Sequence, residues 1–237
     1  MRSCAQAWSA AVSASLTYLG HCAFLWRTEL GRTLLIDPYG DPVDGRWFLR
    51  AFPPVESDVV AVTHDHFDHN ELDALPGHPT VLRGAGSFRL DDLSVTGVMD
   101  LHSGRSGQRG MVNIVFVVEV SGVRFCHIGD NRHDLSCEVR QDIGGVDVLM
   151  VTVDDSSHLL TNEQVDILVQ SLSPRVVVPM HYYIPDLTAV ESTLETPDGW
   201  LATQSSVRRL GSPEVEISPE GLPANREAWV FDAKWGD

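Results

Sequence analysis

The segment at positions 64–69, HDHFDH, concentrates three imidazoles and two carboxylates in six residues, directly after the apolar run at 59–63. Neutral imidazole and carboxylate are ligands that zinc and its first-row neighbours prefer in proteins. His64 and His66 are two residues apart, so in an extended chain their side chains face the same side and can bind one ion. This residue set indicates a metal site.

Asp68 and His69 follow where we expect the chain to turn into a helix beginning near residues 70–72. Their side chains are then free to point at a second ion beside the first. The alternative is a solvated, charged turn whose histidines bind nothing. The segment lies at the carboxyl end of an apolar strand, where open α/β sheets bind their ligands, and this position favours the metal site.

The His-x-His-x-Asp-His pattern resembles the metal-binding signature of the metallo-β-lactamase superfamily. The order of ligands in that family implies three more, and the sequence has a residue for each: His102 in DLHSG, Asp130 in CHIGDN and His181 in VPMHY. Taken singly, they could be a loop histidine, a helix-capping aspartate and a buried core histidine. Their matching order favours ligation. The implied ligand set is His64, His66, Asp68, His69, His102, Asp130 and His181.

Two upstream segments resemble one branch of the superfamily more closely. These are YLGHCAF at 18–24 and LLIDP at 34–38, which are similar to the amino-terminal strands of the ascorbate-6-phosphate lactonase-like metal-dependent hydrolases. That branch usually has Ser or Ala after Gly-His, whereas this chain has Cys22. The resemblance as a whole covers roughly residues 15–218.

The same resemblance implies roles for residues around the ligands. It places His21 and His127 near the site, either as catalytic residues that contact substrate or as support for the ligands, with plain packing as the alternative. Asp37 resembles the buried carboxylate that braces the ligand loop, a role that metal sites require to fix imidazole tautomers. His158 lies in a loop expected over the pocket, where it either contacts substrate or is simply exposed.

The composition is typical of a single soluble domain. The chain has 237 residues, 43% of them hydrophobic, which is enough to bury a sizeable core. We expect a loose extension over 1–14 and one domain over 15–237. No apolar run is long enough to cross a bilayer. The four cysteines show no paired metal-binding spacing, which favours a reduced, cytoplasmic setting.

The net charge of −16 bears on partners. Such an acidic chain repels phosphate backbones, and its arginines are scattered rather than clustered. We therefore expect a small-molecule substrate, with no nucleic acid and no membrane as partner. The sequence leaves the oligomeric state open, a homo-oligomer included.

Short apolar runs separated by Gly, Pro and Asp predict a strand-rich α/β chain. The clearest helix is 162–172, where Thr161 and Gln164 form a capping box. A β-hairpin is expected around Gly122. With the resemblance, this pattern predicts an αββα four-layer sandwich, the metallo-β-lactamase fold. The predicted strands are 15–20, 22–29, 32–37, 58–63, 80–83, 93–98, 111–120, 123–128, 146–153 and 175–180.

This ligand set implies a dinuclear, metal-dependent hydrolase. Two divalent ions would share a bridging hydroxide that attacks a small-molecule lactone, ester or phosphoester, with Asp68 orienting the water. We expect Zn²⁺, while Mn²⁺ and Fe also suit His and Asp ligands. The pocket should be built by loops around 40–50, 103–110 and 154–160.

Two other classes of function are compatible with the same ligands. One is a di-iron redox enzyme, although such relatives usually carry a flavin-binding domain for which 237 residues leave no room. The other is a metal-stabilised binding protein without catalysis, which an open, loop-lined site argues against because structural zinc sites are closed.

Overall fold

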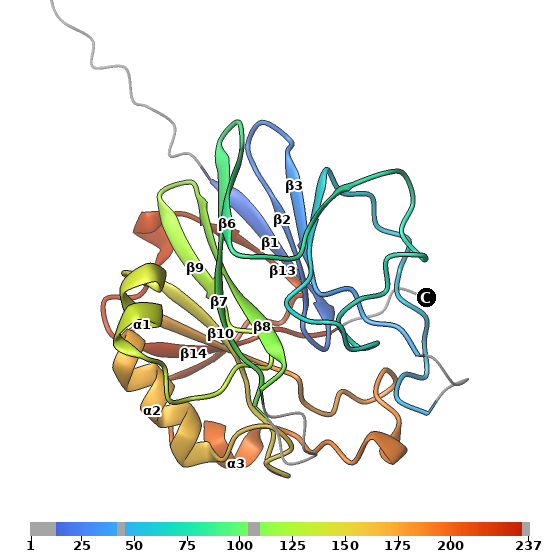
Figure 1. Cartoon of the computed structure of the whole chain (residues 1–237). Helices are drawn as coiled ribbons and strands as arrows, with labels where there is room; N and C mark the ends of the chain where they lie inside the picture. Colours follow the sequence, from blue (N-terminus) through green and yellow to red (C-terminus); the bar gives the residue numbers. More distant parts are fainter. Residues whose placement is uncertain (1–12, 42–45, 104–109, 234–237) are drawn as a thin grey trace, which may run out of the picture.

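The computed structural model describes residues 13–41, 46–103 and 110–233. Two β-sheets pack face to face in it, with α-helices beside them (Figure 1). Residues 1–12, which make up most of the expected amino-terminal extension, lie outside the described residues. No helix within the described ranges is both long enough and apolar enough to cross a bilayer.

The first sheet has six strands in the order β13-β1-β2-β3-β4-β5. In this sheet β2 pairs antiparallel with both β1 and β3. The strand β4 pairs parallel with both β3 and β5. The strand β13 comes from the carboxyl-terminal part of the chain and pairs with β1. The bounds are β1 (Ala14–Gly20), β2 (Ala23–Arg27), β3 (Thr33–Ile36), β4 (Val59–Ala61), β5 (Thr80–Leu82) and β13 (Glu214–Ile217).

The second sheet has eight strands in the order β12-β14-β11-β10-β9-β8-β7-β6. An antiparallel half, β6 to β9, continues into a parallel half. Ser121 and Gly122 turn β8 into β9 with φ values of 51° and 73°, as a two-residue hairpin loop requires. The bounds are β6 (Gly86–Leu90), β7 (Leu93–Leu101), β8 (Val112–Val120), β9 (Val123–His127), β10 (Val148–Thr152), β11 (Val176–Met180), β12 (Val207–Arg209) and β14 (Glu227–Val230).

The helices of the described residues lie beside the eight-stranded sheet (Figure 1). In α2, the Thr161 hydroxyl accepts from the Gln164 backbone N–H and the Gln164 side chain accepts from the Thr161 backbone, which completes the predicted capping box. The apolar stripe of α2 is buried. The bounds are α1 (Cys137–Ile143), α2 (Asn162–Leu172) and α3 (Asp198–Leu201), with short 3-10 turns η1 (Val190–Ser192) and η2 (Pro219–Gly221).

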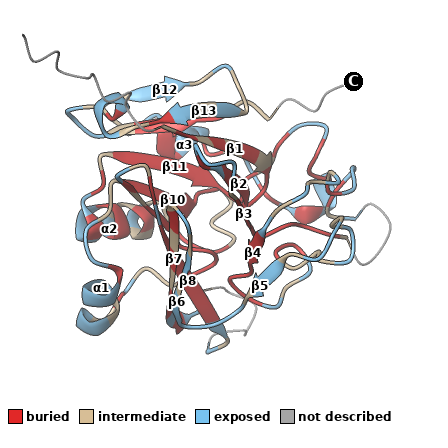
Figure 2. Cartoon of the chain, turned by 90° about the horizontal axis from the view of Figure 1, so that it is seen from above, coloured by how far each residue is buried: buried red, intermediate tan, exposed pale blue. Residues whose placement is uncertain are grey.

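The core lies between the two sheets, where buried residues concentrate (Figure 2). Trp26 of β2 meets Phe125 of β9 edge to face, with ring centroids 5.7 Å apart, and Phe24 meets His127 at 6.0 Å. These contacts join the first sheet to the second. The predicted α/β fold class with two packed sheets is confirmed.

The ten predicted strands are all present, eight of them one to three residues shorter than expected and two of them longer, and helix 162–172 has the predicted bounds. The strands β6, β12, β13 and β14 were not predicted. The helix expected near residues 70–72 is wrong: this segment forms turns. Pro76 limits any helix here to a few residues, a length that is unstable without tertiary support. The backbone N–H of Glu71 instead donates to the carbonyl of Pro38 at 2.8 Å, which ties the segment to the end of β3.

Candidate metal centre

Five chain segments bring their polar side chains to one end of the two sheets. The motif 64–69 follows β4, and His102 follows β7. Asp130 comes after β9, and His181 comes directly after β11. His21 lies in the turn between β1 and β2. The metal-binding residues implied by the sequence therefore converge, although they are drawn from both sheets.

A first cluster contains four residues whose ligand atoms all lie within 4.8 Å of one another: His64, His66, His102 and Asp130. His64 Nε2 is 3.0 Å from His66 Nδ1 and 3.6 Å from Asp130 Oδ2. His102 Nε2 is 3.4 Å from the same carboxylate oxygen. Three imidazoles and one carboxylate thus surround a single point.

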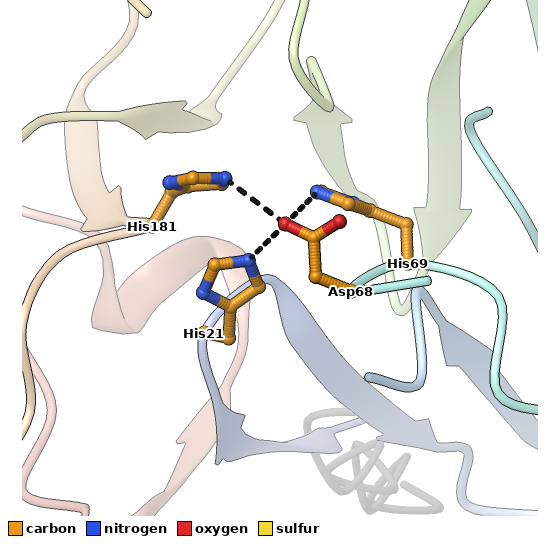
Figure 3. A group of neighbouring side chains, drawn as sticks. All are labelled: His21, Asp68, His69 and His181. Atoms are coloured by element: carbon orange, nitrogen blue, oxygen red, sulfur yellow. Dashed lines mark hydrogen bonds and ion pairs between the residues drawn. The ribbon is translucent and has the colours of Figure 1, made fainter. Parts of the chain in front are cut away.

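A second cluster meets the same distance limit and consists of His21, Asp68, His69 and His181 (Figure 3). Asp68 Oδ2 lies 3.1 Å from His21 Nε2, 3.6 Å from His181 Nε2 and 3.7 Å from His69 Nε2. Asp130 also reaches this cluster, at 3.4 Å from His69 Nε2 and 3.5 Å from His181 Nε2. Asp130 therefore lies between the two clusters.

Several nitrogen and oxygen atoms in the clusters are buried without a hydrogen-bond partner. They are His66 Nε2, His69 Nε2, His102 Nε2, Asp130 Oδ1, His21 Nδ1 and His181 Nδ1. Buried polar atoms in folded proteins are nearly always satisfied, so unpartnered donors and acceptors at one point indicate a missing ligand. Imidazole and carboxylate around a shared centre are the donor set of zinc and similar divalent ions, and the residues present fit such ions.

Backbone geometry at the site is unusual. His21 has φ 53° and His181 has φ 61°, a region that non-glycine residues rarely adopt and that concentrates at functional sites. The two turns are joined, since the His181 backbone N–H donates to the His21 carbonyl at 3.1 Å. Gly129, at φ 58°, has no space for a Cβ, which would lie 2.6 Å from Asn113 Oδ1. A close approach of this kind lets Asp130 enter the site.

The family is decided by comparison with known proteins. Residues 15–181 match the family model described as a β-lactamase superfamily domain. The chain belongs to this family.

Relatives cover most of the chain. A UPF0173 metal-dependent hydrolase of Methanoculleus marisnigri is 28% identical over 86% of this chain and 97% of its own length. A UPF0173 protein of Pyrococcus abyssi is 30% identical over 70% of this chain and 82% of its own length. Among solved structures, a Thermotoga maritima protein described as a candidate Zn-dependent hydrolase of the metallo-β-lactamase superfamily is 28% identical, with a TM-score of 0.70 over 92% of this chain and 98% of that one.

In this member of the β-lactamase superfamily, Asp37 braces the motif from behind. Its Oδ1 accepts from the Thr63 backbone N–H at 2.8 Å, and its Oδ2 accepts from the Thr63 hydroxyl at 2.7 Å. Asp37 Oδ2 also lies 2.8 Å from His69 Nδ1. This contact leaves Nε2 of His69 facing the cluster, which is the support that the sequence implied for Asp37.

The site opens into a cavity of about 280 Å³. Its walls come from the three predicted loop regions, through Trp47, Ser103, His158 and Leu159, and from the motif residue Phe67, which the sequence analysis did not single out. Residues 42–45 and 104–109 of these loops lie outside the described residues. The floor consists of residues from both clusters, namely His66, Asp68, His102, Asp130 and His181.

Three residues outside the implied ligand set have now been placed. His21 belongs to the second cluster rather than behind it. His158 lines the cavity, and its ring stacks on that of His181 with centroids 5.9 Å apart. The substrate contact suggested for His127 is wrong: this residue is fully buried away from the cavity, and its Nε2 lies 2.9 Å from the Cys22 carbonyl. Its position is one of support behind the turn that carries His21.

Burial and charge oppose each other within the site. Burial, reinforced by the neighbouring His69, lowers the pKa of His64 to about 3. Burial alone would raise the pKa of the Asp130 carboxyl, but His69 and His181 outweigh it and hold that pKa well below its usual range. Burial likewise would lower the pKa of His69, but Asp130 and Asp68 raise it well above its usual value. The carboxylates therefore stay charged, while burial lowers the pKa of His21, His64 and His66 and the neighbouring carboxylates raise that of His69 and His181.

The metal-free protein should lose stability as the pH falls from about 6.5 to about 4. The folded-state pKa values of His64 and His21 are lowered to about 3 and about 4, largely by burial. In this window the unfolded chain binds protons that the folded state refuses, so the free energy of unfolding falls by about 1.4 kcal/mol per pH unit for each such group. The raised pKa values of His69 and His181 add no slope in this window, because the folded and unfolded states both bind those protons below about pH 6.5; that stabilisation is lost only as the pH rises through the raised folded-state pKa values.

Urea unfolding of chelator-treated protein across this pH range measures the slope. His64→Gln should make the slope shallower, because it removes one of the groups that titrate only in the unfolded chain. His78→Gln, at an exposed position before β5, should leave the slope unchanged. A metal-free protein whose unfolding free energy stays constant or rises towards acid pH would contradict this electrostatic description.

Proposed function

We propose that this enzyme, a metal-dependent hydrolase of the metallo-β-lactamase superfamily, is dinuclear and cleaves a small-molecule ester, lactone or phosphoester. The observation that carries the proposal is the pair of buried four-residue clusters linked through Asp130 at the floor of one cavity. His64, His66 and His102 would hold one ion, Asp68, His69 and His181 the other, and Asp130 would bridge them.

Bound divalent ions would supply an activated water and polarise the bond to be cleaved. The chain's own residues must place that water and manage its protons. The imidazoles of His69, His181 and His21 hold the pKa of the Asp68 carboxyl well below its usual range, so this carboxylate stays ionised and would orient a water at the second cluster by accepting a hydrogen bond from it. His21, 3.1 Å from Asp68 Oδ2, fixes the orientation of the carboxylate.

The cavity walls support a substrate with an apolar portion. Trp47 contacts Phe67 edge to face at a centroid distance of 5.4 Å and His158 at 5.8 Å, so the three rings form a continuous aromatic wall. Leu159 extends the apolar lining. Such walls bind the non-reacting part of a substrate and exclude water, while the polar floor determines its orientation. About 280 Å³ suits a small molecule rather than a polymer.

Three further points refine the proposal. The GHC and IDP segments around His21 and Asp37, which resemble the ascorbate-6-phosphate lactonase-like branch, favour the lactone or phosphoester end of the substrate range. The nitrogen and oxygen donors suit zinc best among the candidates, with manganese and iron also accepted. The net charge of −16 argues against long nucleic acids as partners.

Metal content tests the dinuclear arrangement directly. Protein purified without chelator and offered zinc or manganese should contain close to two divalent ions per chain by elemental analysis. Asp130→Ala should lose metal from both clusters, because its carboxylate approaches His102 and His64 on one side and His69 and His181 on the other. Asp65→Ala is the control, because the Asp65 side chain is 82% exposed within the same motif. A metal content near zero in the wild-type protein would exclude the dinuclear centre. Two iron ions per chain would instead favour a redox enzyme.

Activity tests the role of Asp68. A screen of chromogenic esters, lactones and phosphodiesters should reveal turnover that depends on added metal. Asp68→Asn preserves shape but removes the charge, and turnover should fall by at least about a hundredfold, as for a lost general base. The melting temperature should change little, and Asp65→Asn should retain full activity. Unchanged turnover in Asp68→Asn would eliminate the proposed role.

The kinetics of a cavity-wall variant test whether the substrate binds against the aromatic wall. Trp47→Ala should raise KM by about tenfold with a smaller change in kcat, because the aromatic wall binds substrate and transition state alike. Leu49→Ala is the matched control: Leu49 lies two residues away, is 58% exposed and does not line the cavity. Equal kinetics in wild type and Trp47→Ala would show that the substrate does not use this wall.

A further inference from the structure

The sulfur of Cys22 lies beside the second cluster. Its Sγ, one ligand atom of His69 and one of Asp130 all lie within 4.8 Å of one another, and all three residues are buried. Cys22 follows His21 in the turn between β1 and β2 and is 0% exposed. It forms no disulfide, and its backbone carbonyl, rather than its sulfur, lies 2.9 Å from His127.

The two partners of this sulfur have unused ligand atoms. His69 Nε2 and Asp130 Oδ1 are buried and lack a hydrogen-bond partner, although they lie 3.4 Å from each other. The residues themselves are 0% and 2% exposed, so solvent does not satisfy these atoms. Both partners of the Cys22 sulfur therefore keep a buried ligand atom that has no hydrogen-bond partner among the described residues.

We infer that Cys22 is a further ligand of the ion held by His69 and Asp130, which makes the second half of the centre a mixed nitrogen, oxygen and sulfur site. On binding, the sulfur–metal bond forms and the thiol proton is released to solvent, with no change of oxidation state. This inference rests on the proposed metal-dependent function and refines it.

A sulfur ligand alters which metal the site prefers. Thiolate favours zinc, whereas manganese prefers oxygen donors, so Cys22 would select zinc in a site whose other donors accept both. The turn between β1 and β2 supplies this ligand from a fully buried position. Selectivity would then come from a residue that does not line the cavity.

X-ray absorption of the zinc-loaded protein tests the inference without any need for a substrate. A zinc–sulfur shell at about 2.3 Å is separable from nitrogen and oxygen shells at about 2.0–2.1 Å. We expect this sulfur shell in wild type and its loss in Cys22→Ala. Cys126→Ala is the matched control, because Cys126 is equally buried, in β9, and belongs to none of the described ligand groups.

Metal competition gives a second readout. Cys22→Ala should reduce the preference for Zn²⁺ over Mn²⁺ by at least about tenfold, whereas Cys126→Ala should leave it unchanged. Zinc bound normally with no sulfur shell would overturn the inference and leave the proposed function standing. Failure of the wild type to bind metal at all would instead overturn the proposed function. Circular dichroism and melting curves of both variants distinguish loss of the ligand from loss of the fold.

Discussion

The Asp130 carboxylate is the feature on which the rest of the site depends. It lies within 3.6 Å of four imidazoles that come from three separate segments of the chain. Its backbone N–H donates to the Asn113 side chain at 3.2 Å, and the Asn113 amide donates to the Ile128 carbonyl at 2.9 Å. Asn113 belongs to β8, so the eight-stranded sheet itself fixes the position of Asp130.

The same region joins the two sheets. The Ile114 backbone N–H of β8 donates to the carbonyl of Thr63, at the start of the ligand motif, at 2.8 Å. Thr63 is also bonded to Asp37 at the end of β3. Gly129 allows this contact, because any side chain there would collide with Thr63 at 2.8 Å. The site is therefore held by rigid strand ends, as a metal centre needs if its ligands are to keep their geometry.

Charge explains why such a site is built for cations. Carboxylates at positions 37, 68 and 130 are buried beside imidazoles whose pKa values burial mostly lowers, as at His64 and His21. Unpaired buried charge is costly, and a divalent ion offsets it by direct bonds to oxygen and nitrogen. The aromatic wall above, through Trp47, then gives the cavity an apolar side facing a charged floor. In the proposed hydrolysis of a small ester or lactone, the apolar side would bind the non-reacting part of the substrate and the charged floor would orient the bond that is cleaved.

The sequence by itself determined the motif at 64–69, most of the buried strands and helix 162–172, because apolar runs and capping residues act locally. It did not predict β6, β12, β13 and β14: β6 and β12 are largely exposed and leave little pattern, and β14, although mostly buried, has only four residues. It also predicted a helix after the motif, where a backbone bond from Glu71 to Pro38 prevailed. Only the tertiary structure placed His21 in the second cluster, moved His127 behind it and brought Cys22 to Asp130, because these contacts join residues far apart in the chain and depend on how two sheets pack.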